Sequence, residues 1–269
     1  MTDEDARADM LGALVAALEF YTRIPRPRGI PFAPADAERS ATFLPFAGWV
    51  VGATCALVYV LAIQALPPEV AVTLALLAGV ALTGALHEDG FADTCDAFGA
   101  RADRERTLEI LKDPRCGAFA VTGLVLLLLL KVVALTALAY DAGAAVVAVT
   151  LIAAHALSRL AAVLAMRGQS YARAGDASTR AGGFAAPPQG TDLAIAAAFG
   201  LAPLALFAVV DLAWAIACVI PVAVARWLMA SMFARRIGGY TGDCLGAVQQ
   251  VAEVLVLLTA CAAVGPVSM

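Results

Sequence analysis

Long apolar runs separated by shorter polar segments dominate the chain. A helix that spans a membrane needs roughly 20 apolar residues, because each residue adds about 1.5 Å against a hydrocarbon core of about 30 Å. Seven stretches fit, at about 42–66, 69–86, 116–139, 143–166, 192–210, 212–233 and 246–264. A further apolar stretch at 8–23 also carries Asp9, Glu19 and Arg23, so we expect a helix at the interface or against the bundle. The pattern predicts an all-α, polytopic membrane helix bundle of about seven transmembrane helices plus this N-terminal interfacial helix, in a single domain over 1–269.

Composition agrees with a membrane protein and narrows the function. Of the 269 residues, 62% are hydrophobic and 15% charged, whereas soluble domains are about 45–50% apolar and about 25% charged. The net charge of −4 provides no basic field for nucleic acid. The six cysteines are widely spaced without a CxxC pair, which argues against a disulfide framework or a zinc site. The acidic N-terminus lacks the basic region of a signal peptide, so we expect the apolar segments to remain in the mature protein.

The positions of Arg and Lys predict the orientation. They concentrate before the first span and in every second loop, while the turns at 67–68, 140–141 and 211 contain none. Short loops rich in Arg and Lys face the cytoplasm. We therefore expect a multi-pass protein of the cytoplasmic (inner) membrane, with the N-terminus and all long polar loops inside. An active site is then expected at the cytoplasmic face.

The densest acidic cluster follows the second predicted span, at residues 87–96. On a helix, Asp89, Asp93 and Asp96 lie at i, i+4 and i+7 and form one stripe. Like charges at this spacing repel one another, so a cation is expected nearby. Mg²⁺ suits the stripe because it takes carboxylate oxygens and shares its shell with substrate phosphates. The alternative is a solvated acidic loop at a helix end. Glu88 points about 100° away and is expected to face water or a neighbouring helix.

Five cations follow in the same loop: Arg101, Arg104, Arg106, Lys112 and Arg115. Cations opposite a carboxylate stripe suit a phosphorylated, anionic substrate. The positive-inside preference alone would also place them here. A short helix is predicted at about 103–112, ended by Pro114.

A glycine-rich segment, 238–247, precedes the last span and contains Gly242 and Asp243. Glycines allow close backbone approach to a ligand, and Asp243 is expected at the membrane depth of the aspartate stripe. The alternative is a turn in which Asp243 only caps the following helix. The loop 172–189 is a candidate to fold over a bound substrate.

Several polar residues lie inside predicted spans, where they are costly and usually face the bundle interior: Lys131, His155, Arg159, Arg226, Gln249, Gln250 and Glu253. We expect Arg159, Arg226 and Glu253 to line the floor of one cavity. The alternative is a structural Arg–Glu pair that locks helix packing. Lys131 is deeper and His155 isolated, and neither has an assigned role.

Together, these blocks resemble one family. The block His87-Glu-Asp89-Gly90-Phe-Ala-Asp93-Thr-Cys-Asp96, with Lys112-Asp113-Pro-Arg115-Cys-Gly117 after it, resembles cobalamin synthase, the adenosylcobinamide-GDP ribazoletransferase family. The resemblance extends, in the same order, to the blocks beginning at Phe20, Leu44, Ser158 and Thr241. It therefore covers nearly the whole chain.

The resemblance implies an enzyme that joins adenosylcobinamide-GDP to α-ribazole or its 5′-phosphate and releases GMP, the last step of cobalamin nucleotide loop assembly. Its cofactor would be Mg²⁺, bound by Asp89, Asp93, Asp96 and Asp243. Asp93 would be central to catalysis, and His87 would accept the hydroxyl proton or stabilise the loop. Substrate binding would fall to Arg101, Lys112, Asp113, Arg115, Arg159 and Gly242. The partners would be these small molecules and the lipid bilayer, without nucleic acid, and a homo-oligomer stays open.

Two alternatives remain at this point. One is a CDP-alcohol-type membrane phosphotransferase, although its Asp-x-x-Asp-Gly and second Asp-x-x-x-Asp pair are not matched here. The other is a cation-coupled transporter with Asp93, Arg159 and Glu253 as a relay. Transporters usually place their site near the midplane between repeats, whereas these acids cluster at one face.

Overall fold

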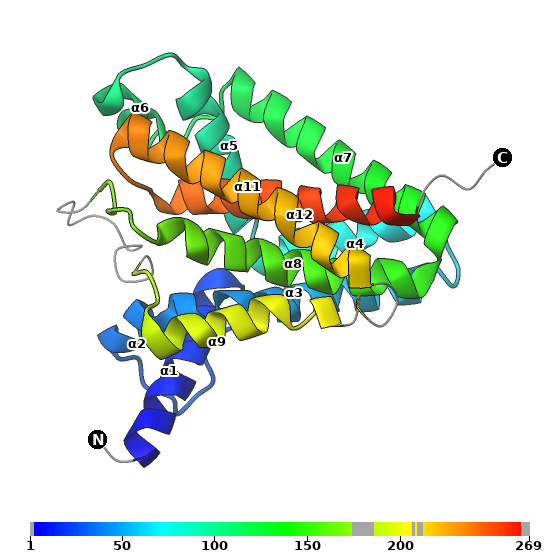
Figure 1. The fold of residues 1–269 in the computed structure, drawn as a ribbon, viewed down its shortest axis with the longest axis horizontal. Coiled ribbons are helices and arrows are strands. Elements are labelled where there is room, and N and C mark those ends of the chain that lie inside the picture. Colours follow the sequence, from blue (N-terminus) through cyan, green and yellow to red (C-terminus); the bar gives the residue numbers. More distant parts are fainter. Residues whose placement is uncertain (1–2, 174–185, 206–207, 209–211, 265–269) are drawn as a thin grey trace.

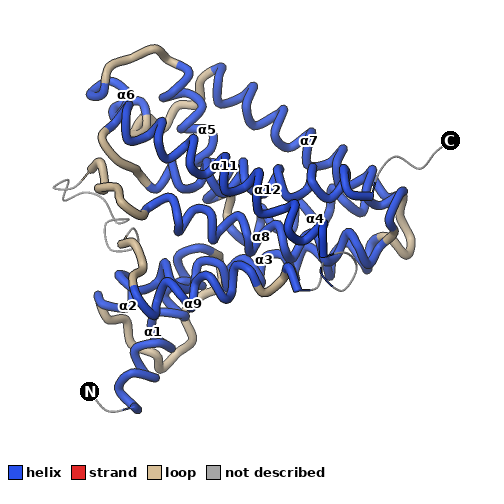
Figure 2. Tube along the Cα trace, viewed as in Figure 1, coloured by secondary structure: helices blue, strands red, loops and turns tan. Residues whose placement is uncertain are grey.

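The computed structural model describes residues 3–173, 186–205, 208 and 212–264, and over these it is helical (Figure 2). The elements are α1 (Asp3–Tyr21), α2 (Pro34–Arg39), η1 (Ser40–Phe43), α3 (Leu44–Ala62), α4 (Pro68–Thr83), α5 (Leu86–Gly99), α6 (Arg104–Ile110), α7 (Ala118–Ala142), α8 (Ala144–Met166), α9 (Gly190–Leu201), α11 (Leu212–Ile237) and α12 (Gly242–Val264). The β-type pairing within these residues is one isolated parallel bridge, between Tyr171 and Tyr240. The predicted all-α bundle is confirmed.

The helices from the seven predicted spans run along the long axis of the molecule in alternating directions (Figure 1). The prediction of seven full spans is not met by the described residues, where five helices are long and apolar enough to cross a membrane, or six if a bent pair counts as one crossing. The two short members are α4, with 16 residues, and α9, with 12. At about 1.5 Å per residue they reach roughly 24 Å and 18 Å, less than a full hydrocarbon core. Part of the predicted span 192–210 lies outside the described residues.

Helix α8 forms the centre of the bundle. Within its apolar stretch 78% of the residues are buried, against 28% in α7 and 22% in α11, which present most of their surface outward. Glycines let α3 approach the α8 backbone, since a Cβ on Gly48 would lie 2.4 Å from the carbonyl oxygen of His155. Small residues at such contacts are typical of membrane helix packing, which depends on close van der Waals contact.

The charged connections gather at one end of the bundle. The α5–α6–α7 connections, the segment between α11 and α12, and helix α1 lie at this end, whereas the α3–α4 and α7–α8 turns lie at the other (Figure 1). The polar connections that the structure describes therefore share one side, as predicted. Helix α1 packs there against α2 and η1.

A sharp bend turns α5 away from α4 by 88°. It occurs at Gly84 and Ala85, whose φ angles of 66° and 61° are both left-handed. Arg23 closes over the bend: its backbone N–H donates to the Leu82 carbonyl at 2.7 Å, and its side chain lies against Gly84. As a result α5 does not continue the direction of α4, and it lies at the end of the bundle between α7 and α12.

Candidate functional site

The site is built where α5 meets the first turn of α12. A Cβ on Gly90 would lie 3.0 Å from both Cα and the carbonyl oxygen of Asp243, and a Cβ on Gly246 would lie 3.3 Å from Gly90 Cα. The two glycines therefore let the helix backbones touch. Because Asp89 and Asp93 flank Gly90 on one side of α5, this contact brings them close to Asp243.

The electrostatics of Asp93 reflect this grouping. Burial, with the neighbouring charges of Asp89, Asp243 and Asp96, raises the pKa of the Asp93 carboxyl to about 7, and Arg173 opposes the shift. A carboxyl whose charged form is disfavoured by other carboxylates is a candidate for cation binding or catalysis. The predicted association of Asp243 with the stripe agrees with this shift.

Asp96 also has a structural role. Its carboxylate accepts hydrogen bonds from the backbone N–H groups of Gly117, at 2.5 Å, and Ala120, at 2.9 Å. Gly117 is the cap residue before α7 and Ala120 lies in its first turn, where the amides have no partners within the helix. Asp96 therefore ties the outer half of α5 to the start of α7, and any part in metal binding stays a prediction.

The donor set has the chemistry that Mg²⁺ requires, since it consists of carboxylate oxygens. Among the residues that the structure describes, no three His, Cys, Asp or Glu side chains converge closely enough to hold a metal ion on their own. Mg²⁺ commonly takes one or two carboxylates and completes its shell with water and substrate phosphates. The arrangement fits an ion that substrate helps to hold.

A pocket of about 150 Å³ lies beside the carboxylates. Its polar wall contains His87, Asp89, Gly242 and Asp243, and its apolar wall is formed by residues of α1, α3, α5, α8 and α12: Phe20, Tyr21, Leu44, Leu86, Ala162, Met166 and Leu245. Burial lowers the pKa of His87 well below its ordinary value, so the imidazole is neutral at pH 7. The pocket therefore joins an apolar surface to acids and a base.

Arg173 is a site residue that the sequence analysis did not assign. Its Nη2 donates to Asp243 Oδ2 at 3.2 Å and to the Leu111 carbonyl at 2.9 Å. The Ala172 N–H donates to the Tyr240 carbonyl at 2.8 Å, and the Tyr240 N–H donates to the Ser170 carbonyl at 3.1 Å. This backbone pairing places Arg173 next to the carboxylate of Asp243. No sequence pattern predicts this contact, because it joins two loops about 70 residues apart.

Comparison with known proteins identifies the family. The model of the cobalamin-5-phosphate synthase family matches residues 13–261. The chain belongs to this family. A Ralstonia nicotianae protein named adenosylcobinamide-GDP ribazoletransferase is 43% identical over 246 residues, covering 91% of this chain and 93% of the relative. Proteins of the same name from Leptothrix cholodnii and Vibrio cholerae are 43% and 36% identical, over 90% and 92% of this chain and 92% of each relative. No solved structure matches the chain. The predicted family is thus confirmed.

The predicted phosphate-binding cations occupy the loop between α5 and α7. The expected short helix is present as α6, capped by Asp103, which accepts from the Arg106 N–H at 2.9 Å. Arg101, Lys112 and Arg115 are exposed. Arg115 pairs with Asp113 at 2.5 Å, and this contact lowers the pKa of Asp113 to about 2. Their roles toward substrate stay predictions.

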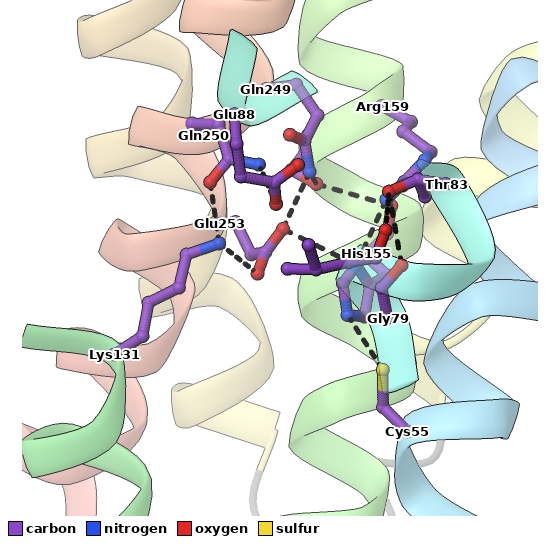
Figure 3. A network of polar contacts seen from close by, with 12 residues as sticks. Cys55, Gly79, Thr83, Glu88, Lys131, His155, Arg159, Gln249, Gln250 and Glu253 are labelled. Atoms are coloured by element: carbon purple, nitrogen blue, oxygen red, sulfur yellow. Dashed lines mark hydrogen bonds and ion pairs between the residues drawn. The ribbon is translucent and has the colours of Figure 1, made fainter. Parts of the chain in front are cut away.

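The expectation for the interior polar residues holds in part: Arg159 and Glu253 line one small cavity, whereas Arg226 does not. Arg226 lies in a separate groove, where its Nη1 donates to the Leu164 carbonyl at 2.9 Å. Glu253 pairs with Lys131, at 2.6 Å, instead of with an arginine. Arg159 is fully buried beside His155, with Nη1 3.1 Å from Nδ1, so His155 is not isolated (Figure 3). These pairings depend on how each helix is rotated, which the hydropathy pattern leaves open.

The loop predicted to fold over substrate, 172–189, falls largely outside the described residues.

Proposed function

We propose that the chain joins adenosylcobinamide-GDP to α-ribazole, or to α-ribazole 5′-phosphate, and releases GMP with the help of Mg²⁺. The names of its relatives support this reaction. The observation that carries the proposal is the contact of Gly90 with the first turn of α12, which groups Asp89 and Asp93 with Asp243 beside a pocket. We further propose that this end of the bundle faces the cytoplasm, because the Arg- and Lys-rich loops lie there.

The reaction requires one bond to form and one to break. An acceptor ribose hydroxyl forms a P–O bond to the phosphorus that carries cobinamide. The anhydride P–O bond to GMP breaks, and GMP leaves with the electron pair. Little covalent work falls to the protein, which must align the two oxygens and balance charge.

Named residues can fill these tasks. Asp89, Asp93 and Asp243 would hold Mg²⁺, which when bound neutralises charge on the diphosphate. Within the part of the chain that the structure describes, Arg173 is a cation in contact with this group, and its buried Nε has no hydrogen-bond partner there, which leaves a donor for a phosphate oxygen. The neutral His87 imidazole lines the pocket and would take the hydroxyl proton.

The test is an assay of detergent-purified protein with adenosylcobinamide-GDP, α-ribazole and Mg²⁺, following GMP and the new corrinoid. We expect release of GMP that EDTA abolishes. Asp93→Asn should remove turnover while the protein stays folded, whereas Asp103→Asn, which keeps an effective helix cap on α6, should retain it. Turnover by Asp93→Asn at ordinary Mg²⁺, or no product from folded wild-type protein, would contradict the proposal.

A further inference from the structure

A cluster of hydrogen-bonded charged and amide side chains lies in the bundle interior (Figure 3), about two to three helical turns further along α12 than Asp243. Lys131 of α7 donates from Nζ to Glu253 Oε1 and to Gln250 Oε1, both at 2.6 Å. Lys131, Gln250 and Glu253 are each at least 98% buried. The cluster therefore joins α7 to α12 without access to water.

Gln250 connects this cluster to α5. Its amide oxygen accepts from Lys131, and its amide nitrogen donates to Glu88 Oε1 at 2.9 Å. Glu88 precedes Asp89 directly, in the first turn of α5. Of the two environments predicted for Glu88, water or a neighbouring helix, the structure therefore shows the neighbouring helix.

The cluster is not a substrate site. The cavity that Glu88, Lys131, Gln250 and Glu253 line has a volume of about 20 Å³. One water molecule already needs roughly 10–15 Å³, so no part of a nucleotide or corrinoid enters. A buried ion pair of this kind contributes little net stability compared with apolar packing, and fixing one arrangement is its better-supported use.

Helix α5 needs such fixing because α4 does not align it. The left-handed residues Gly84 and Ala85 interrupt the helix just before α5 begins. Contacts of α5 with α12 include Gly90 against Gly246 and, one turn further along α12, the hydrogen bond of Glu88 with Gln250. This hydrogen bond is directional, so it constrains the tilt of α5 in addition to the packing of α5 on α7 and α12. A tilt of about 10° around Gly90 moves the Asp93 Cα by about 0.8 Å, because the two residues are about 4.5 Å apart along the axis.

We propose that Gln250, held by the Lys131–Glu253 pair and bonded to Glu88, is a positioning residue that sets the tilt of α5 and thereby the place of Asp89 and Asp93 opposite Asp243. These interior residues act through α5 and do not touch substrate. The expected kinetic effects rest on the proposed function, whereas the expected effect on the conformation of α5 does not.

The test compares Gln250→Met with Gln249→Met. Both remove a buried amide from adjacent positions, but Gln249 donates to Glu253, at 2.6 Å, and to Ser158 of α8, at 3.1 Å, and so does not reach α5. We expect Gln250→Met to lower kcat by about 10- to 100-fold and to raise the half-saturating Mg²⁺ concentration, since a misplacement near 1 Å costs about 100-fold. Gln249→Met should leave the Mg²⁺ dependence unchanged.

Exchanging the two groups provides the rescue. Glu88→Gln combined with Gln250→Glu keeps one carboxylate, one amide and both hydrogen bonds, although the carboxylate now lies beside Glu253 on Lys131, so we expect a Mg²⁺ dependence closer to wild type than that of Gln250→Glu alone. Gln250→Glu alone places two carboxylates together and should be impaired.

Amide hydrogen exchange of residues 86–99 gives a readout that needs no turnover. Gln250→Met should accelerate this exchange, and the exchanged pair should restore it. If wild type is inactive but the exchange pattern appears as expected, the proposed function fails and the positioning role stands. Wild-type exchange and wild-type Mg²⁺ dependence in folded Gln250→Met, or equal effects of both Met variants, would overturn the positioning role.

Discussion

Replacing Gly90 with Ala tests the contact that assembles the site. The added Cβ would lie 3.0 Å from Asp243 Cα and 3.0 Å from its carbonyl oxygen, whereas ordinary van der Waals contact begins at 3.4 Å. Both neighbours are backbone atoms, so α5 itself must move away by about 0.4–1 Å. Overpacking costs about 1–3 kcal/mol, and the better helix propensity of Ala returns about 1 kcal/mol. The net loss of stability should therefore be at most about 2 kcal/mol.

The effect on activity should be larger than the effect on stability. A displacement of 0.4–1 Å between the α5 carboxylates and Asp243 is expected to lower kcat by about 10- to 100-fold. The half-saturating Mg²⁺ concentration should rise in parallel, as measured by GMP release over a Mg²⁺ titration. Thermal unfolding of the same detergent preparation measures the loss of stability.

Two further variants sharpen this test. Gly246→Ala fills the same contact from the α12 side, with its Cβ 3.2 Å from the His87 carbonyl oxygen, so it should share the phenotype, and the double variant should be less than additive. Gly200→Ala overpacks α9 against Leu160 of α8, at 2.5 Å, away from the site, and should lower stability without changing the Mg²⁺ dependence. Full kcat with normal Mg²⁺ dependence in folded Gly90→Ala would refute the reasoning.

Three other outcomes are expected. Asp96→Ala removes the acceptor of two α7 amides and should lower stability by about 1–2 kcal/mol even at saturating Mg²⁺, as measured by thermal unfolding; a variant rescued fully by Mg²⁺ would argue against the capping role. Lys131→Met leaves the Glu253 carboxylate buried without its cation and should lower the free energy of unfolding by about 3–5 kcal/mol, most of which adding Glu253→Gln should recover. Chemical unfolding measures both variants, and a single variant as stable as wild type would contradict the role of the pair. The pKa of Asp93 is about 7, so a proton on its carboxyl competes with Mg²⁺ near neutral pH. The apparent Mg²⁺ affinity should therefore fall roughly eightfold from pH 7.5 to pH 6 and stay level above pH 8. A flat profile would indicate an ordinary carboxyl.

Features set by neighbouring residues could be predicted from the sequence. Apolar runs long enough for a bilayer became α3, α7, α8, α11 and α12, because hydrocarbon leaves the backbone no partner except its own helix. The stripe at Asp89, Asp93 and Asp96 follows from helical periodicity. The short helix predicted at about 103–112, ended by Pro114, is α6, whose ends lie within a few residues of the predicted ones.

Other features depended on how distant segments pack. The bend at Ala85 places a non-glycine residue at a φ of 61°, which costs about 1–2 kcal/mol and is sustained by contacts from other helices. It shortened the second span and turned the acidic stripe toward α12. Arg173 reaches Asp243 only because two loops pair, and Lys131 meets Glu253 across 122 residues of sequence. Hydropathy indicates that a helix forms and that polar groups inside it need partners, but helix rotation and crossing angles decide which partners they find, and these are set by the packing of the whole bundle.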